Sequence, residues 1–277
     1  MAETGDVMTP FGARLSAAVG EYGPLCVGID PHASLLADWG LSDDVSGLET
    51  FASTVVEAMA GEVAVVKPQS AFFERHGAAG VAVLERTVQA AREAGLLVLL
   101  DVKRGDIGST AAAYADAYLD AASPMQVDAV TVSPYLGFGS LEPFLSTAER
   151  NGGGVFVLAL TSNPEGPEVQ HARAGDQTVA GRMLGHLRER NAGATPQGSY
   201  GAVVGATVGD LTEDVAINGP LLIPGFGAQG GTVADLRRLF GGVWDHVLPA
   251  SSRGILAAGP DVAGLREAAR KVRDELA

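Results

Sequence analysis

The chain has 277 residues and a mass of 28.3 kDa; 47% of the residues are hydrophobic, 19% are charged, and the formal net charge is −14. The apolar fraction excludes a disordered chain, and the acidic balance argues against nucleic acids and anionic membranes as partners, because both attract positive surfaces. One cysteine cannot form an internal disulfide, and the sequence shows no signal peptide, no 18-residue apolar run and no Cys/His cluster with zinc spacing. We therefore expect a globular, cytoplasmic protein.

Short apolar segments alternate with amphipathic segments along the whole chain, after a leading helix predicted at residues 11–23. Continuous runs of Val, Leu and Ile are typical of strands that are buried on both faces. The predicted strands cover residues 25–30, 63–68, 96–103, 128–134, 154–162, 201–207, 220–227 and 246–252. The amphipathic segments, predicted as helices, include residues 48–61, 80–95, 109–122, 176–191, 232–242 and 261–277.

Alternating strands and helices imply right-handed crossovers and a parallel sheet. Eight strands favour a closed (β/α)₈ TIM barrel, with a doubly wound open sheet as the alternative. No linker or shift in composition suggests a second domain, so we predict one domain over residues 1–277, with the leading helix closing the bottom of the barrel. The connection at residues 163–200 is long and is predicted to hold a loop, residues 163–175, before its helix.

Only three of the 19 basic residues are lysines, namely Lys67, Lys103 and Lys271, and the other 16 are arginines. A coding bias toward arginine explains most of this split. A lysine that persists against such a bias suggests a role that arginine cannot fill, because arginine does not release its proton near neutral pH. Lys271 belongs to a charged C-terminal helix and is interpreted as a solvated surface residue. Lys67 and Lys103 follow apolar runs instead.

Polar side chains end the predicted strands, at the barrel end where active sites of this fold lie. Asp30 ends the first strand, Lys67 the second, and Asp101 with Lys103 the third. His32, which follows Asp30 closely, could also contact a ligand. A charge at the mouth of a barrel needs a partner or a ligand. We therefore expect these charged residues to gather in one pocket.

The densest group of such residues is the segment DVKRGDIGST, residues 101–110. Asp101 and Lys103 are two apart on a strand and are expected to point to the same face. Asp106 follows a turn and can fold back toward Lys103. A lysine held between two carboxylates stays protonated despite partial burial, and so supplies a positioned proton donor. The alternative interpretation is a purely structural salt-bridge network.

The second signal is the glycine-rich segment IPGFGAQGG, residues 223–231, followed after the next strand by SSRG, residues 251–254. Glycine-rich turns let backbone N–H groups approach a phosphate, and the loops after the seventh and eighth strands are the recurrent phosphate site of this fold. Arg253 can bind two phosphate oxygens at once. The sequence therefore predicts a phosphorylated ligand.

Taken in order, these motifs resemble those of orotidine 5′-phosphate decarboxylase over essentially the whole length of the chain. The long connection after the fifth strand and the opening FGARL resemble the subgroup found in mycobacteria and some other bacteria. The matching positions are Asp30, Lys67, the D-x-K-x-x-D motif with a following threonine (Asp101, Lys103, Asp106, Thr110), Ser162, the segment from Pro224 to Gly231, and Arg253.

The resemblance implies decarboxylation of orotidine 5′-phosphate to uridine 5′-phosphate in pyrimidine biosynthesis, without a metal or an organic cofactor. It implies that Lys103 protonates the ring carbon after carbon dioxide is lost, and that Asp101 and Asp106 keep Lys103 charged. The implied substrate contacts are Arg253, Gln229, Pro224 and Gly225 for the phosphate, Asp30, Lys67 and Thr110 for the ribose, and Ser162, in preference to Thr161, for the pyrimidine.

The resemblance also implies a homodimer with shared active sites, because Asp106, Ile107 and Thr110 of the family reach the neighbouring subunit's site. Three alternatives remain open. A sugar-phosphate decarboxylase or synthase of the same superfamily carries an acidic metal ligand at the position of Lys67. A Schiff-base aldolase needs a neutral lysine, which flanking carboxylates oppose. A non-catalytic protein that binds a phosphorylated ligand would explain Arg253 but not the cluster of Asp101, Lys103 and Asp106.

Overall fold

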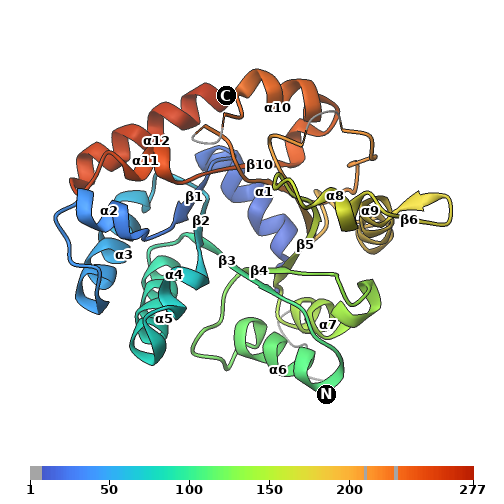
Figure 1. Cartoon of the computed structure of the whole chain (residues 1–277), viewed down its shortest axis with the longest axis horizontal. Coiled ribbons are helices and arrows are strands. Elements are labelled where there is room, and N and C mark those ends of the chain that lie inside the picture. The colour runs from blue at the N-terminus through green and yellow to red at the C-terminus, as the bar shows by residue number, and fades with distance from the viewer. Residues whose placement is uncertain (1–7, 209–210, 228–229) are drawn as a thin grey trace, which may run out of the picture.

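A computed structural model describes residues 8–208, 211–227 and 230–277 and shows a closed barrel of eight parallel strands (Figure 1). The strand order around the barrel is β1-β10-β9-β8-β5-β4-β3-β2, and β1 pairs with both β2 and β10. This closure confirms the predicted TIM barrel and excludes the open sheet. Each strand of the barrel overlaps a predicted segment, and β3 and β8 each extend one residue beyond theirs. The strands are β1 (Cys26–Ile29), β2 (Val65–Pro68), β3 (Leu97–Arg104), β4 (Ala129–Val132), β5 (Gly154–Leu160), β8 (Tyr200–Val204), β9 (Leu221–Ile223) and β10 (Val247–Ser251).

Helices surround the barrel, and the six predicted helical segments correspond to α3 (Val45–Met59), α5 (Gly77–Glu93), α6 (Gly108–Leu119), α9 (Val179–Arg190), α10 (Val233–Phe240) and α12 (Val262–Leu276). The helix α7 (Glu142–Arg150) was not among the predicted segments; its second residue, Pro143, suits the first turn of a helix. The shorter helices are α2 (Ala33–Asp38), α4 (Ser70–Glu74), α8 (Pro167–Gln170), α11 (Arg253–Leu256), η1 (Phe138–Leu141) and η2 (Gly241–His246). Within the described ranges, no helix has both the length and the apolar character needed to cross a membrane.

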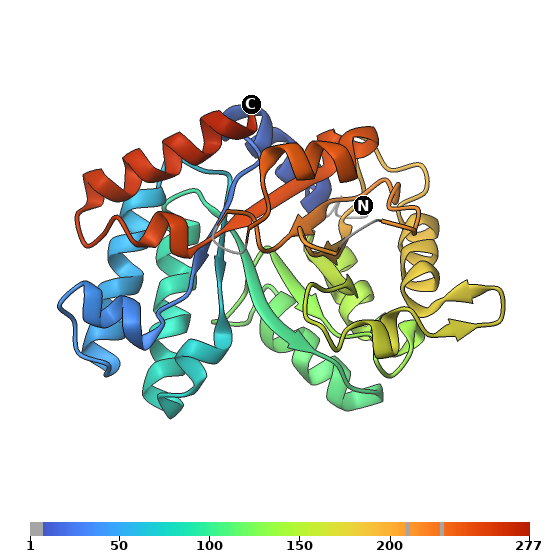
Figure 2. The same ribbon diagram turned by 45° about the horizontal axis from the view of Figure 1, so that its top comes forward.

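The long connection after β5 is more structured than the loop predicted at residues 163–175. It contains α8 and then a small antiparallel hairpin formed by β6 (Arg173–Ala174) and β7 (Gln177–Thr178). The hairpin projects from the side of the barrel (Figure 2). Its second strand leads directly into α9, where the side chain of Thr178 caps the helix by accepting a hydrogen bond from the Gly181 N–H.

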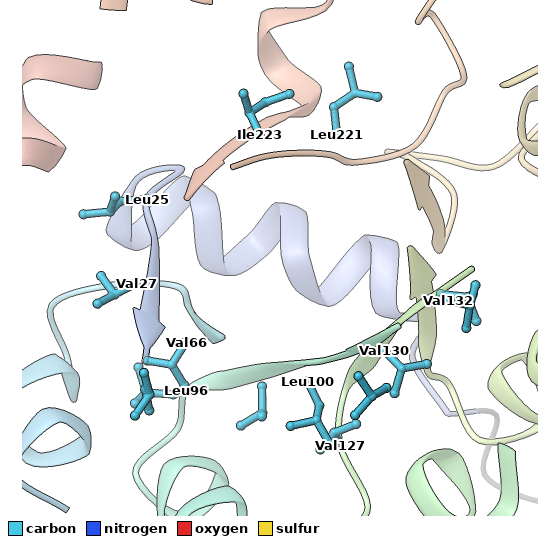
Figure 3. Packing of buried hydrophobic residues seen from close by; sticks show 14 of the residues in the cluster. Leu25, Val27, Val66, Leu96, Leu100, Val127, Val130, Val132, Leu221 and Ile223 are labelled. Carbon is cyan, nitrogen blue, oxygen red and sulfur yellow. The ribbon is translucent and has the colours of Figure 1, made fainter. Parts of the chain in front are cut away.

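The outer face of the barrel wall packs against the surrounding helices. Strand residues such as Val27, Leu100 and Ile223 are fully buried in this layer and point away from the barrel interior (Figure 3). Alternate strand residues face inward instead and form a separate buried cluster, which is why each strand is apolar on both faces. The inward cluster includes Cys26, Val65, Leu99, Ala129, Phe156, Val203, Leu222 and Leu248.

The leading helix α1 (Phe11–Tyr22) packs against this inner cluster at the amino-terminal end of the strands (Figure 3). The ring of Phe11 lies edge-on to that of Phe156, with 6.0 Å between centroids. Arg14 forms an ion pair with the buried carboxylate of Asp128 and donates a hydrogen bond to the Gly152 carbonyl. The packing and the ion pair together close the bottom of the barrel and leave the opposite end for a site.

Candidate active site

The main pocket lies at the carboxyl ends of the strands, directly above the inner apolar cluster. Side chains on a strand return to the same face every two residues. The positions two residues beyond Cys26, Val65, Leu99 and Ala129 are therefore the next inward layer, and they line the pocket. The pocket has a volume of about 430 Å³. Its lining includes Gly28, Asp30, His32, Lys67, Gln69, Asp101, Lys103, Thr131, Leu158, Thr161, Ser162, Pro224, Gly225, Phe226, Ser251, Ser252 and Arg253.

Four charged side chains of alternating sign form the floor and one wall of this pocket. Lys67 Nζ lies 3.9 Å from Asp30 Oδ1 and 3.2 Å from Asp101 Oδ2. The other oxygen of Asp101 lies 2.5 Å from Lys103 Nζ. The order is therefore Asp30, Lys67, Asp101, Lys103, and Asp101 is shared by two ammonium groups. The close approach of β1, β2 and β3 produces this order, with Gly28 beside Lys67 and Gln69 beside Asp101.

Burial and charge act in opposite directions on the two central groups. Burial alone would lower the pKa of Lys67, but the carboxylates of Asp30 and Asp101 outweigh it and raise the pKa above its ordinary value. Burial alone would raise the pKa of Asp101, but Lys67 and Lys103 outweigh it and lower the pKa to about 2. Both groups are therefore charged at neutral pH, and the site holds fixed charges in a partly buried place.

The structure corrects one detail of the predicted cluster. The lysine that lies between two carboxylates is Lys67, between Asp30 and Asp101. Lys103 contacts Asp101, but no ion pair within the described part of the chain joins it to Asp106. The Asp106 carboxylate instead accepts a hydrogen bond of 2.8 Å from the Ile107 N–H. The turn after β3 carries Asp106 away from the pocket of its own chain, so this carboxylate does not line it.

Lys103 stands at the mouth of the pocket, on an irregular part of β3. Its backbone has a φ of 47°, in the left-handed region that residues other than glycine seldom adopt. The side chain of Lys103 is 45% exposed, whereas that of Lys67 is 8% exposed. The position of the Lys103 ammonium therefore depends less on packing than on its ion pair with Asp101. An ammonium that is both accessible and oriented is suited to meet a bound ligand.

The side of the pocket formed by the segments after β9 and β10 carries the features expected of an anion site. Arg253 is exposed, lines the pocket as the first residue of α11, and forms no ion pair with any residue the structure describes. Pro224 and Gly225 line the same side, and Gly225 has a φ of 91°, which disfavours any other residue there. The predicted phosphate contact Gln229 lies outside the described residues.

Two buried oxygens in the pocket lack hydrogen-bond partners among the residues described. They are Asp30 Oδ1 and Ser252 Oγ, and both belong to residues that line the pocket. Gly28 lies between them: a Cβ at this position would lie 2.8 Å from the Ser252 Cβ and 2.9 Å from Asp30 Oδ2. Buried polar atoms are normally paired, so these two oxygens are suited to the hydroxyl groups of a ligand.

Thr161 and Ser162 both line the pocket, but only one of the two hydroxyls is free. The Thr161 hydroxyl lies 2.6 Å from the Asn163 side-chain oxygen and 2.7 Å from the Gln170 amide nitrogen. Ser162 is exposed and makes no side-chain hydrogen bond with any residue in the described ranges. This difference favours Ser162 as the residue that is available to a ligand.

The remaining predicted residues lie outside the pocket. Thr110 is exposed on the first turn of α6, and Asp106 precedes that helix. Two further residues, Gln69 and Thr131, line the pocket but were not predicted from the sequence. Gln69 directly follows β2, and a polar residue after a strand is too common to indicate a site. Thr131 stands alone as a polar residue in the apolar strand AVTV, and a threonine is unremarkable in a strand.

The donor set of the pocket does not resemble a divalent-metal site. Such a site needs several carboxylate, imidazole or thiolate ligands around one point. Within residues 8–208, 211–227 and 230–277, no group of three or more His, Cys, Asp or Glu side chains is placed to hold a metal ion. Between Asp30 and Asp101, where a cation would bind, stands the ammonium group of Lys67.

The fold and the pocket define a (β/α)₈-barrel enzyme with its charged site at the carboxyl ends of the strands. Comparison with known proteins agrees with this class. A model of the family described as "Orotidine 5′-phosphate decarboxylase / HUMPS family" matches residues 23–268. The chain belongs to this family, as its motifs indicated.

Relatives over the full length of the chain have the same name. A Nocardioides protein named orotidine 5′-phosphate decarboxylase is 66% identical over 274 residues, which cover 97% of this chain and 99% of the relative. A protein of the same name from Streptomyces coelicolor is 64% identical over 271 residues, covering 97% and 98%. A crystal structure from Streptomyces avermitilis, provisionally named as the same enzyme, has a TM-score of 0.96 and 62% identity, and the match covers 100% of this chain and 98% of that one.

The low pKa of Asp101 predicts a specific loss of stability in acid. A carboxylate whose pKa is depressed by folding stabilises the native state above its ordinary pKa of 3.8, and this contribution disappears as the pH falls toward 2. Asp101→Asn should be less stable than the wild type at pH 6. The gap in the free energy of unfolding should narrow by on the order of 2 kcal/mol between pH 5 and pH 2. Denaturant unfolding over this range measures the gap, and a gap independent of pH would contradict the assignment.

Proposed function

We propose that this chain decarboxylates orotidine 5′-phosphate to uridine 5′-phosphate, as its family and its relatives suggest. The observation that carries the proposal is the Asp101 carboxylate shared by Lys67 and Lys103 in a pocket that Arg253 also lines. One side of the pocket is suited to a phosphate, and the other presents an oriented ammonium group. This is what a nucleotide that loses a carboxylate requires.

The reaction breaks the bond between ring carbon 6 and the carboxylate, and carbon dioxide leaves. The electron pair of that bond stays on carbon 6, where it creates a negative centre. Lys103 Nζ would stabilise this centre and then transfer its proton to carbon 6, which completes uridine 5′-phosphate. No electrons are gained or lost overall, so the step needs no redox cofactor. Asp101 would hold the Lys103 ammonium in place during the reaction.

The substrate contacts follow the walls of the pocket. Arg253, together with Pro224 and Gly225, would bind the phosphate, and Arg253 has no competing ion pair among the described residues. The family resemblance adds Gln229, which lies outside the described residues, to these phosphate contacts. Asp30 and Lys67 would bind the ribose, and this role is supported by Asp30 Oδ1, which has no hydrogen-bond partner among the described residues. The free hydroxyl of Ser162 would contact the pyrimidine. Phosphate binding remote from the reacting carbon would then support the chemical step by holding the substrate in place.

A homodimer would complete the site. Asp106, Ile107 and Thr110 face away from the pocket of their own chain, and we propose that they reach the partner's pocket. Ile107 is 62% exposed, and Tyr135 and Leu136, on the loop after the neighbouring strand β4, are 77% and 52% exposed. Large apolar side chains exposed together are typical of an interaction surface. Burial of this surface in a dimer would bring Asp106 to the Lys103 of the partner subunit.

The alternative functions fit these contacts less well. A metal-dependent sugar-phosphate enzyme would need an acidic ligand where Lys67 stands. A Schiff-base aldolase would need a neutral lysine, and Lys67 is held in its charged form by Asp30 and Asp101. A protein that only binds phosphorylated ligands would have no use for a chain of four alternating charges. We also propose a cytoplasmic location and no nucleic-acid partner, on the basis of the single buried Cys26 and the acidic net charge.

The purified protein should decarboxylate orotidine 5′-phosphate at an unchanged rate in excess chelator, because Lys67 takes the place of an acidic metal ligand. The assay follows the loss of absorbance of the orotate ring, with and without the chelator. Activity that vanished in chelator and returned with magnesium would favour the sugar-phosphate alternative. No turnover of orotidine 5′-phosphate under either condition would contradict the proposed function itself.

Substitutions should separate chemistry from binding. Lys103→Ala should lower kcat on the order of 10⁴-fold or more, because it removes both the proton donor and the stabilising charge. Its affinity for uridine 5′-phosphate should change little. Arg253→Ala should weaken that affinity by roughly 10- to 100-fold, because it removes a charge-assisted phosphate contact. Titration calorimetry and initial rates measure both effects.

Lys103→Arg is the sharper control for this pair, because it keeps the positive charge but not a proton that can be released. We expect it to be nearly inactive, with an unchanged circular dichroism spectrum. Near wild-type turnover in Lys103→Arg would remove Lys103 from the role of proton donor and leave the cluster as a structural salt bridge.

Mixing inactive variants tests whether the site is shared between subunits. Lys103→Ala and Asp106→Ala homodimers should each be inactive, but a hybrid dimer has one site with both residues intact. Equal mixing with free exchange should restore roughly a quarter of the wild-type activity, since half of the dimers are hybrids with one intact site each. Exchange is checked independently with differently tagged chains. Demonstrated exchange without recovered activity would contradict the shared site.

A further inference from the structure

One buried hydroxyl binds three consecutive residues of the catalytic strand. Thr131, on β4, is 1% exposed, and its side chain lines the pocket. Its Oγ1 lies 2.8 Å from Asp101 Oδ1, 3.1 Å from the Val102 backbone nitrogen and 3.0 Å from the Lys103 backbone nitrogen. A single side chain of β4 therefore holds both the carboxylate and the backbone of the segment that carries the proposed proton donor.

The chemistry of a hydroxyl fixes the direction of these three hydrogen bonds. A threonine hydroxyl has one proton to donate and two lone pairs to accept. The N–H groups of Val102 and Lys103 can only donate, so they occupy both lone pairs. The proton must then point at Asp101 Oδ1, the same oxygen that Lys103 Nζ contacts at 2.5 Å. The Thr131 hydroxyl therefore makes all three of its hydrogen bonds with Asp101, Val102 and Lys103.

The backbone of β3 needs this support because its pairing with β4 is interrupted here. Leu100 pairs with Val130, but the next pair is Arg104 with Val132. Three residues of β3, from Asp101 to Lys103, therefore stand opposite the single residue Thr131. Such a bulge leaves backbone groups without their regular ladder partners and redirects the side chains that it carries. The Thr131 hydroxyl takes the place of the missing acceptor for two of these N–H groups.

We propose that Thr131 is the positioning residue of this site, which holds the bulge so that Lys103 and Asp101 keep their mutual orientation. This inference rests on the proposed function, because it assigns Lys103 and Asp101 the reacting and orienting roles. Thr131 acts through these two residues. Since the Lys103 side chain is 45% exposed and its φ is 47°, neither packing nor backbone preference would hold it in place. Removal of the hydroxyl should therefore affect kcat far more than ligand affinity.

The test compares Thr131→Val, which keeps the branched shape but removes the hydroxyl, with Thr131→Ser, which keeps the hydroxyl. We expect Thr131→Val to lower kcat on the order of 100-fold, as small misplacements of reacting groups do. Its KM and its affinity for uridine 5′-phosphate should stay within about threefold of the wild type, because the phosphate and ribose contacts lie elsewhere. Thr131→Ser should lose less than about fivefold in kcat, since one methyl group contributes no hydrogen bond.

Two further readouts distinguish positioning from a general structural role. The Thr131 hydroxyl is one of the groups that lower the pKa of Asp101, so its loss should shift the acidic limb of the kcat–pH profile to higher pH. Amide hydrogen exchange at Val102 and Lys103 should become at least about tenfold faster in Thr131→Val, with the rest of β3 and β4 unchanged. The exchange measurement does not depend on turnover of any substrate.

Thr87→Val is the matched control, because Thr87 is also buried, at 5% exposed, but its hydroxyl donates to the Val83 carbonyl within α5 and bonds to no other residue that the structure describes. It should keep the wild-type kcat and pH profile. If Thr131→Val does not fold, Thr131→Ala carries the same expectations. A folded Thr131→Val or Thr131→Ala with the kcat, pH profile and exchange of the wild type would overturn the proposal. A wild-type protein inactive on orotidine 5′-phosphate would instead overturn the proposed function, and the exchange result would still decide how the bulge is held.

Discussion

The site depends on the Asp101 carboxylate, which is shared by two ammonium groups. Two neighbouring lysines would repel each other, and a buried lysine alone would lose its charge, but one carboxylate between them stabilises both. Asp101 keeps this role because its own negative charge is fixed by the same two neighbours. Asp30 has Lys67 as its ion-pair partner and Lys103 has Asp101, so removal of Lys67 or of Asp101 would leave a charge without its partner in this pocket. The two central residues therefore stabilise the charges at both ends of the row.

Much of the fold could be predicted from the sequence, because strands that are buried on both faces consist of continuous runs of apolar residues. The cluster was harder to predict. The alternation of side chains along a strand predicted that Asp101 and Lys103 share one face. The position of Lys103 also depends on the bulge opposite Thr131. No residue in the segment DVKRGD predicts this bulge. The placement of Lys67 between Asp30 and Asp101 depends on the pairing of β2 with both β1 and β3, which brings together residues more than 30 positions apart. Local patterns cannot specify such contacts.

Shorter elements escaped prediction for a related reason. The helix α7 has few apolar residues in its nine positions, and the hairpin of β6 and β7 is only two residues long on each side. Neither element is long enough for its repeat of apolar and polar residues to be recognised in the sequence. The position of Asp106 outside its own pocket was likewise not evident from spacing. A turn in which Asp106 bonds the next N–H, rather than Lys103, differs from the expected turn only in local backbone angles.

The helix that closes the barrel has a consequence for the order in which the chain can fold. Helix α1 is synthesised before any strand, yet its partners come late: Arg14 pairs with Asp128, and the Gly12 N–H donates to the Ser199 hydroxyl, 187 positions away. Contacts so distant in sequence are entropically costly and form slowly. On a ribosome, α1 has no completed surface to dock on until Leu248 of β10 has emerged, because the inner cluster has residues from every strand of the barrel. The helix that is synthesised first can therefore dock only after nearly the whole barrel has been made.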